Sequence, residues 1–495
     1  MPRSKEGFLW TPNATTEGLT TSSVRRSSLN IKAHYDVIVI GAGFAGLIAA
    51  RDLSQKHNLS VLLIEARDRI GGRTWTANIL DEQVEMGGTW VHWAQPHVYA
   101  ELHRYGLHRT LKTSAGFAET QRQTFTSSTG VIEEVNICEC GEILERIAAR
   151  VFCVDGYGSR ELMPFPHDSL REPALWRRFD GLSVKDRLDA LQLEGVSMSR
   201  WERELFESNV STFGSAGCGE IGFVDALRWY ALGGYSMAGV FEMAGVYKLG
   251  QGGMTGFAEA ILEEYKGDSL FDTAVMEIKQ VGSGVEVVTA SGRKLTARTV
   301  VSTIPLNCMS DIKFTPPLSP LRQAAAAQGH INKGAKIHFK LRETLPGWGW
   351  TGSGFGDSEY VFAFSDHNGN QPSGPSGTWC IGFGYNGKLA DRKDSQHVIG
   401  QFKKNVNPNV TVEAYATHDW ENDPYAKGVW ACWGPNSASR YLEELQQRHG
   451  RIVFANADWA DGWRGFVDGA IEQGQVAVRE VVKLLKGDSV CTAKL

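Results

Sequence analysis

A glycine-rich run, Gly41-Ala42-Gly43-Phe44-Ala45-Gly46, contains residue types that let a main chain approach phosphate groups closely. It follows an apolar, β-branched stretch at 34–40 and precedes apolar residues at helical spacing, so a strand, a turn and a helix are predicted. Gly41 would permit the tight turn, Gly43 the approach of a pyrophosphate, and Gly46 the packing of helix against strand. Because N–H groups at a helix start attract phosphate, the pattern predicts a dinucleotide site.

An acid at the end of the next predicted strand strengthens this assignment. Glu65 directly follows the apolar run 60–64 and lies 19 residues beyond the last glycine, near the spacing of an acid that binds ribose hydroxyls. This favours NAD or FAD over NADP. Ala66, Arg67 and Arg73 come next, and the arginines are predicted to pair with phosphate in fork geometry. The alternative interpretation of this arginine- and glycine-containing run is a basic turn at the protein surface.

The glycine pair Gly87-Gly88, which precedes Thr89 and Trp90, would allow the backbone to lie against a flat ring. The runs EARDRIGGRTW and EMGGTWVH resemble the flavin-containing amine oxidase family, and the likeness extends over about residues 35–485. It implies FAD as the cofactor. EMGGTWVHW and the end of the chain look most like the fungal monoamine oxidases of that family.

The resemblance also implies roles for residues far from the glycine-rich run. Val275 falls where the family lays backbone against adenine. In FANADWADGWRGFVDGAIEQG, residues 454–474, Asp458 takes the place of the acid that meets the ribityl chain. Val467 would offer its backbone N–H to the pyrimidine end of the flavin.

Two aromatic residues are candidates for a cage around the substrate amine. The family places two rings roughly perpendicular to the flavin, and Trp430 and Phe466 fall on those positions by motif. Aromatic faces tolerate an amine, and apolar walls disfavour its charged form. From the pattern alone both would be core residues, so the catalytic role is what the resemblance implies.

Lys336 is the third catalytic candidate. It lies in a predicted strand where apolar residues alternate with Lys336, His338 and Lys340, and this pattern alone indicates a solvated basic face. The resemblance instead implies a lysine that holds a water at the flavin N5 edge and aids reoxidation by O₂.

Val429 stands where membrane-bound animal members of the family have the cysteine that bonds to the flavin, and Cys432 lies three residues later. We therefore expect FAD to be noncovalent. The C-terminal membrane helix of those relatives has no counterpart in this sequence, so a soluble enzyme without a membrane span is expected.

The resemblance implies an α/β fold, with a Rossmann-like FAD-binding domain of the GR2 type and an interleaved α+β substrate domain over the flavin. Residues 270–301 are predicted to form strands with turns at 282–284 and 291–292. Residues 1–33 are expected to be a flexible arm and 486–495 a tail. The FAD-binding domain would combine residues 34–114, 246–321 and 446–485, and the substrate domain residues 115–245 and 322–445.

Composition excludes several other classes of protein. The chain has 495 residues, 42% of them apolar, and a net charge of −5, so a globular protein without affinity for nucleic acid is expected. Eight scattered cysteines argue against a disulfide framework, and no metal site is predicted.

The last three residues, Ala493-Lys494-Leu495, differ by one substitution from the S-K-L peroxisomal targeting signal. A peroxisomal import receptor would therefore carry the chain from the cytosol into the matrix. The sequence leaves open whether the protein forms a homodimer.

The expected activity is that of a monoamine oxidase. A small neutral amine would be oxidised to the imine, which hydrolyses to an aldehyde or ketone and ammonia, while O₂ becomes H₂O₂. A polyamine oxidase or an L-amino-acid oxidase of the same fold is the first alternative, and these need acids along a tunnel or an arginine facing a carboxylate. A non-catalytic flavin-binding scaffold is the alternative from another class.

Overall fold

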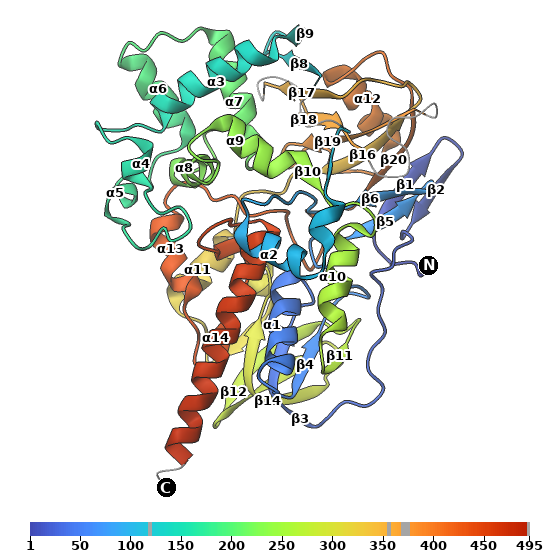
Figure 1. The fold of residues 1–495 in the computed structure, drawn as a ribbon, viewed down its shortest axis with the longest axis vertical. Helices are drawn as coiled ribbons and strands as arrows, with labels where there is room; N and C mark the ends of the chain where they lie inside the picture. Colours follow the sequence, from blue (N-terminus) through green and yellow to red (C-terminus); the bar gives the residue numbers. More distant parts are fainter. Residues whose placement is uncertain (117–120, 354–357, 368–376, 493–495) are drawn as a thin grey trace.

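The computed structural model describes residues 1–116, 121–353, 358–367 and 377–492. Two large sheets organise these residues, as Figure 1 shows. The lower half of the view holds an eight-stranded sheet with helices packed on it, and the upper half holds a nine-stranded sheet beside a group of helices. The predicted α/β class is confirmed.

The eight-stranded sheet has a parallel centre. β3 (His34–Ile40) pairs in parallel with β4 (Val61–Ile64) and β14 (Lys294–Ser302). Alternate residues of β3 belong to apolar clusters on opposite faces, so the strand is buried on both sides, as parallel strands usually are. The other strands are β11 (Asp268–Leu270), β12 (Val275–Val281), β13 (Gly284–Thr289), β15 (Lys313–Thr315) and β21 (Ile452–Phe454). β12, β13 and β14 form an antiparallel meander, which confirms the strands and turns predicted for residues 270–301.

Three helices cover one face of this sheet: α1 (Phe44–Gln55), α10 (Gly253–Glu263) and α14 (Val467–Thr492). Their apolar residues share one buried cluster with alternate residues of β3 and β4. α1 and α14 lie side by side in Figure 1, so segments more than 400 residues apart in the chain build the same layer.

The nine-stranded sheet follows the order β2-β1-β20-β16-β19-β18-β17-β8-β9. Its strands are β1 (Phe8–Thr11), β2 (Ala14–Glu17), β8 (Arg122–Thr126), β9 (Ile132–Val135), β16 (Lys336–Leu341), β17 (Trp348–Gly352), β18 (Tyr360–Ser365), β19 (Thr378–Gly384) and β20 (Val412–Thr417). The helices beside it are α3 (Ile137–Val151), α6 (Val184–Leu193), α7 (Arg200–Ser211), α8 (Phe223–Leu232) and α9 (Met237–Phe241). All strands except β1 and β2 fall within residues 115–245 and 322–445.

Shorter elements complete the described part of the chain. The further helices are α2 (Pro96–Arg104), α4 (Ser159–Leu162), α5 (Ala174–Arg177), α11 (Pro320–Gln328), α12 (Ser395–Asn405) and α13 (Ala438–Gln446). Two small ladders join β5 (Thr76–Ile79) to β6 (Glu82–Glu85) and β7 (Lys112–Thr113) to β10 (Tyr247–Lys248).

The N-terminal segment differs from the flexible arm predicted for residues 1–33. β1 and β2 form a hairpin, and β1 adds to the large sheet through β20, at the right-hand edge of the upper half of Figure 1. Phe8 and Leu19 are buried, and the hydroxyl of Thr21 donates to the Thr76 carbonyl at 2.7 Å. The Ser/Thr-rich composition indicated solvated chain, but two buried apolar anchors and partners for the hydroxyls hold the segment against the protein.

The C-terminal segment also differs from the prediction. α14 continues to Thr492, so the predicted boundary between domain and tail at residue 485 falls inside a helix. The tripeptide 493–495 lies outside the described residues, and peroxisomal import stays a prediction. Among the helices that the structure describes, none combines the length and the apolar character needed to cross a membrane.

Candidate functional site

A cavity of about 820 Å³ is lined by residues of both sheets. Its wall includes the carboxyl ends of β3 and β4, the start of α1, strands β16 to β19 and parts of α3 and α9. The structure brings together most of the predicted site residues on this wall: Gly41, Gly43, Ala45, Glu65, Ala66, Arg67, Arg73, Gly87, Gly88, Thr89, Trp90, Val275, Lys336, Trp430, Phe466 and Val467. Gly46 and Asp458 are not on it.

The glycine-rich turn has the conformation that the spacing predicts. Gly41 has φ +102°, and a Cβ there would lie 2.3 Å from the hydroxyl of Thr303. A Cβ at Gly46 would lie 1.9 Å from the Gly41 carbonyl oxygen, so Gly46 permits the close packing of helix on strand. α1 begins at Phe44 with its first residues on the cavity wall and no acid in its first turn, which suits an anionic ligand.

Glu65 directly follows β4 and is a buried carboxylate beside this turn. Its two oxygens accept the backbone N–H groups of Ala42, at 2.6 Å, and Arg67, at 2.9 Å. Burial raises the pKa of Glu65. An acid held this way between the glycine turn and the next loop is suited to accept hydrogen bonds from a ribose.

Both arginines contact protein acceptors, and their predicted pairing with phosphate stays a prediction. Arg67 donates from both terminal nitrogens to Asp423 at 2.8 Å and also forms an ion pair with Glu6. Arg73 donates to the Val429 carbonyl at 2.7 Å and to Asp458 at 2.7 Å. These contacts join chain segments that are distant in sequence around the cavity.

Asp458 lies behind the wall. It is fully buried, and its carboxylate accepts from Arg73 and, at 3.0 Å, from the backbone N–H of Leu306. Burial alone would raise the pKa of Asp458, but the Arg73 guanidinium lowers it, so the group is ionised. The neighbouring Asn456 and Ala457 line the cavity while Asp458 does not, and its contact with a ribityl chain stays a prediction.

Lys336 is buried on the cavity wall, so the solvated basic face suggested by the alternation is wrong. Its Nζ donates to the carbonyls of Glu85, at 2.8 Å, and Gly87, at 2.7 Å, and to the hydroxyl of Thr89, at 2.6 Å. The same nitrogen lies 4.9 Å from the centre of the Trp90 ring. Burial lowers the pKa of the Lys336 ammonium to about 7.

Behind Lys336 lies a buried polar group that sequence reasoning missed. Burial lowers the pKa of His338 to about 3, so its ring is neutral and Nε2–H donates to the Glu85 carbonyl at 2.8 Å. Asp366 lies 3.7 Å from the other ring nitrogen and forms an ion pair with Lys248. No local pattern pointed to Asp366 or Lys248, because they meet only when β10 and β18 are brought together.

Trp430 and Phe466 both line the cavity and are only half-buried. Trp430 donates its indole N–H to the Phe213 carbonyl at 2.7 Å and meets Phe383 edge-to-face, with ring centroids 6.1 Å apart. Phe466 contacts Trp229 and Trp463 at 4.9 and 5.0 Å between centroids. Each ring is therefore held in place by protein and presents one side to the cavity, an arrangement suited to the predicted cage.

The aromatic wall is larger than the predicted pair. Phe362 stacks on Phe383 at 4.1 Å and on Phe364 at 6.0 Å, and all three line the cavity together with Trp348 and Trp350. Alternation in YVFAFS and WGW places these residues on one face of each strand. The alternation could have revealed the shared face, but not that this face lines a cavity.

The comparisons with known proteins agree with this geometry. The model of the flavin-containing amine oxidoreductase family matches residues 44–482. The chain belongs to this family. It is 34% identical over 477 residues to a pseudooxynicotine dehydrogenase of Pseudomonas sp., covering 96% of this chain and 91% of the relative. It is 33% identical over 479 residues to a nicotine dehydrogenase of Pseudomonas putida, covering 94% and 92%.

A solved structure shares the fold at lower sequence similarity. Wild-type putrescine oxidase bound to putrescine superposes with a TM-score of 0.73 at 21% identity, covering 91% of this chain and 99% of that one.

As a flavin-containing amine oxidoreductase, the chain uses FAD, and the residues present fit it. The start of α1 would hold the pyrophosphate of FAD, and Glu65 would hold a ribose. Residues 87–90 and 465–467 line the cavity where they would border the flavin ring. When bound, FAD supplies the two-electron acceptor.

The thiols near the cavity are unsuited to a covalent flavin bond. Val429 carries no thiol, and Cys432 is buried against Gly214, where an added Cβ would lie 2.7 Å from its sulfur. Cys140 and Cys308 line the cavity, but burial raises the pKa of both, that of Cys308 to about 12, so both stay thiols. Acid precipitation is therefore expected to release all of the yellow colour into the supernatant, measured by absorbance. Colour retained in the washed pellet would contradict noncovalent binding.

Proposed function

We propose that this flavin-containing amine oxidoreductase is a monoamine oxidase that acts on a small neutral amine with an apolar body and passes the electrons to O₂. The observation that carries the proposal is the aromatic wall around Lys336, Trp430 and Phe466. Such a wall takes an apolar substituent and disfavours a charged one, because desolvating a charge is costly.

The charged residues of the cavity separate this proposal from the two alternatives within the family. Both arginines on the described wall are engaged with protein acceptors, so neither is free to receive the carboxylate of an amino acid. Of the acids, Glu145 accepts from Ser236 and from the backbone of Ala238, and Asp311 pairs with Lys427. Lys427 compensates the charge of Asp311, whereas Glu145 meets only neutral donors and keeps its charge, so the acids weigh less against a polyamine than the arginines weigh against an amino acid.

The side chains around the cavity would have distinct tasks. Trp430 and Phe466 exclude water and orient the amine, and their apolar surroundings favour the neutral form that reacts. Lys336, held by three oxygen acceptors, keeps a proton-carrying nitrogen at the wall with a pKa of about 7. The product imine leaves and hydrolyses in solution.

A second candidate differs only in the electron acceptor. Two relatives above 30% identity are named dehydrogenases, which favours an acceptor other than O₂ for a chain of this type. In that case amine would reduce the flavin rapidly, while peroxide would form slowly. The substrate class proposed from the cavity would be unchanged.

A peroxide assay over benzylamine, simple alkyl amines, spermine and L-amino acids tests the proposal. We expect peroxide with benzylamine or an alkyl amine, and turnover with spermine or amino acids at least about tenfold lower in kcat/KM. A parallel anaerobic measurement of flavin bleaching separates the candidates, because bleaching without peroxide would indicate a dehydrogenase. Bleaching with none of the amines would favour the non-catalytic scaffold.

A further inference from the structure

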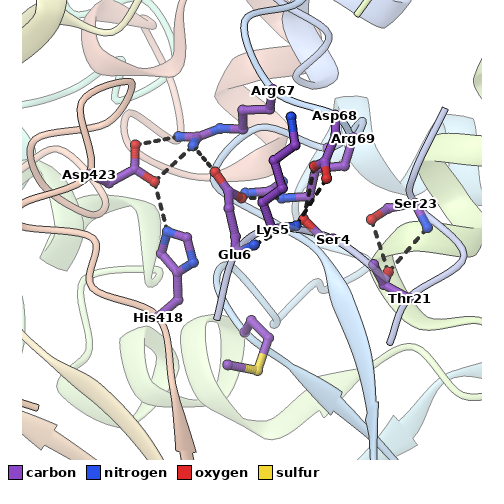
Figure 2. Close-up of polar contacts among 12 residues, drawn as sticks. Ser4, Lys5, Glu6, Thr21, Ser23, Arg67, Asp68, Arg69, His418 and Asp423 are labelled. Carbon is purple, nitrogen blue, oxygen red and sulfur yellow. Dashed lines mark hydrogen bonds and ion pairs between the residues drawn. The ribbon is translucent and has the colours of Figure 1, made fainter. Parts of the chain in front are cut away.

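The N-terminal segment meets the nucleotide-binding loop in a buried ionic cluster of Glu6, Arg67, Asp423 and His418, shown in Figure 2. Arg67 lies between the carboxylates of Glu6 and Asp423. Asp423 also accepts a hydrogen bond from His418 Nε2 at 2.7 Å. These residues come from three segments that are remote in sequence: the N-terminus, the loop after β4 and the chain after β20.

The cluster has the residue types of a metal site, but its charges favour another role. Each carboxylate already contacts a guanidinium: Glu6 pairs with Arg67 and Arg69, and Asp423 forms a two-point contact with Arg67. A metal cation would have to displace these arginines or lie beside them, and both are unfavourable in a buried site. The arginines therefore supply the positive charge.

Residues 4–6 bond to three successive residues of the loop. The Ser4 hydroxyl and the Lys5 backbone N–H both donate to the Asp68 carboxylate, at 2.9 and 3.0 Å. Glu6 then accepts from Arg67 and, at 2.6 Å, from Arg69 Nε. In Figure 2 the side chains of Ser4 and Glu6 point toward this loop.

A second stretch of the N-terminal segment holds the same loop through its backbone. The N–H of Ile70 donates to the Ser23 carbonyl at 3.1 Å, and the N–H of Arg25 donates to the Asp68 carbonyl at 2.8 Å. Residues 4–6 and 23–25 thus hold the loop both through its side chains and through its main chain.

The other side of this loop forms the nucleotide end of the cavity. Glu65, Ala66, Arg67, Gly71 and Gly72 all line it. The backbone N–H of Arg67 donates to the Glu65 carboxylate, and Arg69 donates to the Gly72 carbonyl at 2.8 Å. A shift of residues 67–69 would therefore move the acid that is suited to the ribose.

We propose that residues 4–6 and 23–25 form a clasp that keeps the loop 65–73 in its FAD-binding conformation, with Glu6 as a positioning residue. The inference rests on FAD as the cofactor and is independent of the amine preferred. Among the described residues, Glu6 is the one acid in salt-bridge contact with Arg69, whose side chain is fully buried. Without that carboxylate a buried guanidinium loses its counter-charge, and the loop favours conformations that expose it.

Glu6→Gln tests the clasp through cofactor affinity. Apoprotein of the full chain is titrated with FAD and the quenching of flavin fluorescence gives Kd. We expect Kd to rise about tenfold, as it would if the binding conformation of the loop became about ten times less populated. Glu17→Gln is the matched control, because Glu17 lies in the same N-terminal segment and pairs with Lys393 at the surface. The control is expected to keep the wild-type Kd.

A structural role alone would give a different result. If Glu6→Gln lowered the Tm of the apoprotein but left the Kd for FAD within twofold of wild type, the clasp would be refuted. If this variant did not fold, Ser4→Ala would replace it, since it removes only the hydroxyl that donates to Asp68 and accepts from the Glu6 backbone. An increase in Kd of about threefold is then expected, and an unchanged Kd would overturn the proposal.

Discussion

Lys336→Met is expected to slow the reoxidation of reduced FAD by O₂ about 100-fold while reduction by amine changes far less. Methionine fills a similar volume but cannot donate a hydrogen bond or carry charge. In the wild type, Nζ lies at the cavity wall with a pKa of about 7, so the ammonium is present below pH 7 and the neutral amine above it. A cation stabilises the negative charge that develops as O₂ accepts electrons.

Stopped-flow absorbance measures the two half-reactions separately. The wild-type reoxidation rate is expected to fall as pH rises through about 7, and Lys336→Met should lose this inflection. Lys340→Met is the matched control: Lys340 follows on the same strand, is partly exposed and lies 3.8 Å from Glu413. Equal slowing of both half-reactions would argue against the role assigned to Lys336.

Trp430→Ala is expected to lower kcat/KM for the preferred amine about 100-fold while FAD stays bound. The substitution removes a ring that is fixed by the Phe213 carbonyl and by Phe383, so water can enter and the amine loses its orientation. Trp430→Phe keeps an aromatic face without the indole hydrogen bond, and we expect it to recover part of the loss.

Steady-state kinetics with a flavin absorbance check on each variant would measure this effect. Trp93→Ala serves as the control because Trp93 is 48% exposed, is not on the cavity wall and makes tilted ring contacts with His92 and Tyr247. Unchanged amine kinetics in Trp430→Ala, with FAD content intact, would return this ring to a purely structural role.

The parts of the fold that were predicted correctly depend on local patterns. The run from β3 through Gly41 to α1 combines a β-branched strand, a glycine turn and helical spacing within about twenty residues. The meander of β12, β13 and β14 was recognised from its turns for the same reason. Each of these patterns follows from constraints on neighbouring residues, so it is visible in a short window.

Local patterns did not reveal the surroundings of side chains whose partners are remote in sequence. Arg67 has the residue type of a phosphate ligand, but its guanidinium bonds to acids 61 and 356 positions away. Lys336 alternates like a solvated lysine, but its acceptors lie about 250 residues earlier in the chain. The N-terminal arm is ordered because it pairs with β20 and clasps the loop after β4.

The sequence by itself determined the position of the nucleotide turn, because backbone geometry and glycine spacing act over short distances, whereas FAD and the aromatic candidates came from the family resemblance. Only the tertiary structure decided which arginines are free, which lysine is buried and which acid faces the cavity. The physical reason is that charge and burial are set by whatever surrounds a side chain in space. For Arg67 they are Glu6 and Asp423, near opposite ends of the chain, and for Lys336 they are residues 85–89, about 250 positions earlier.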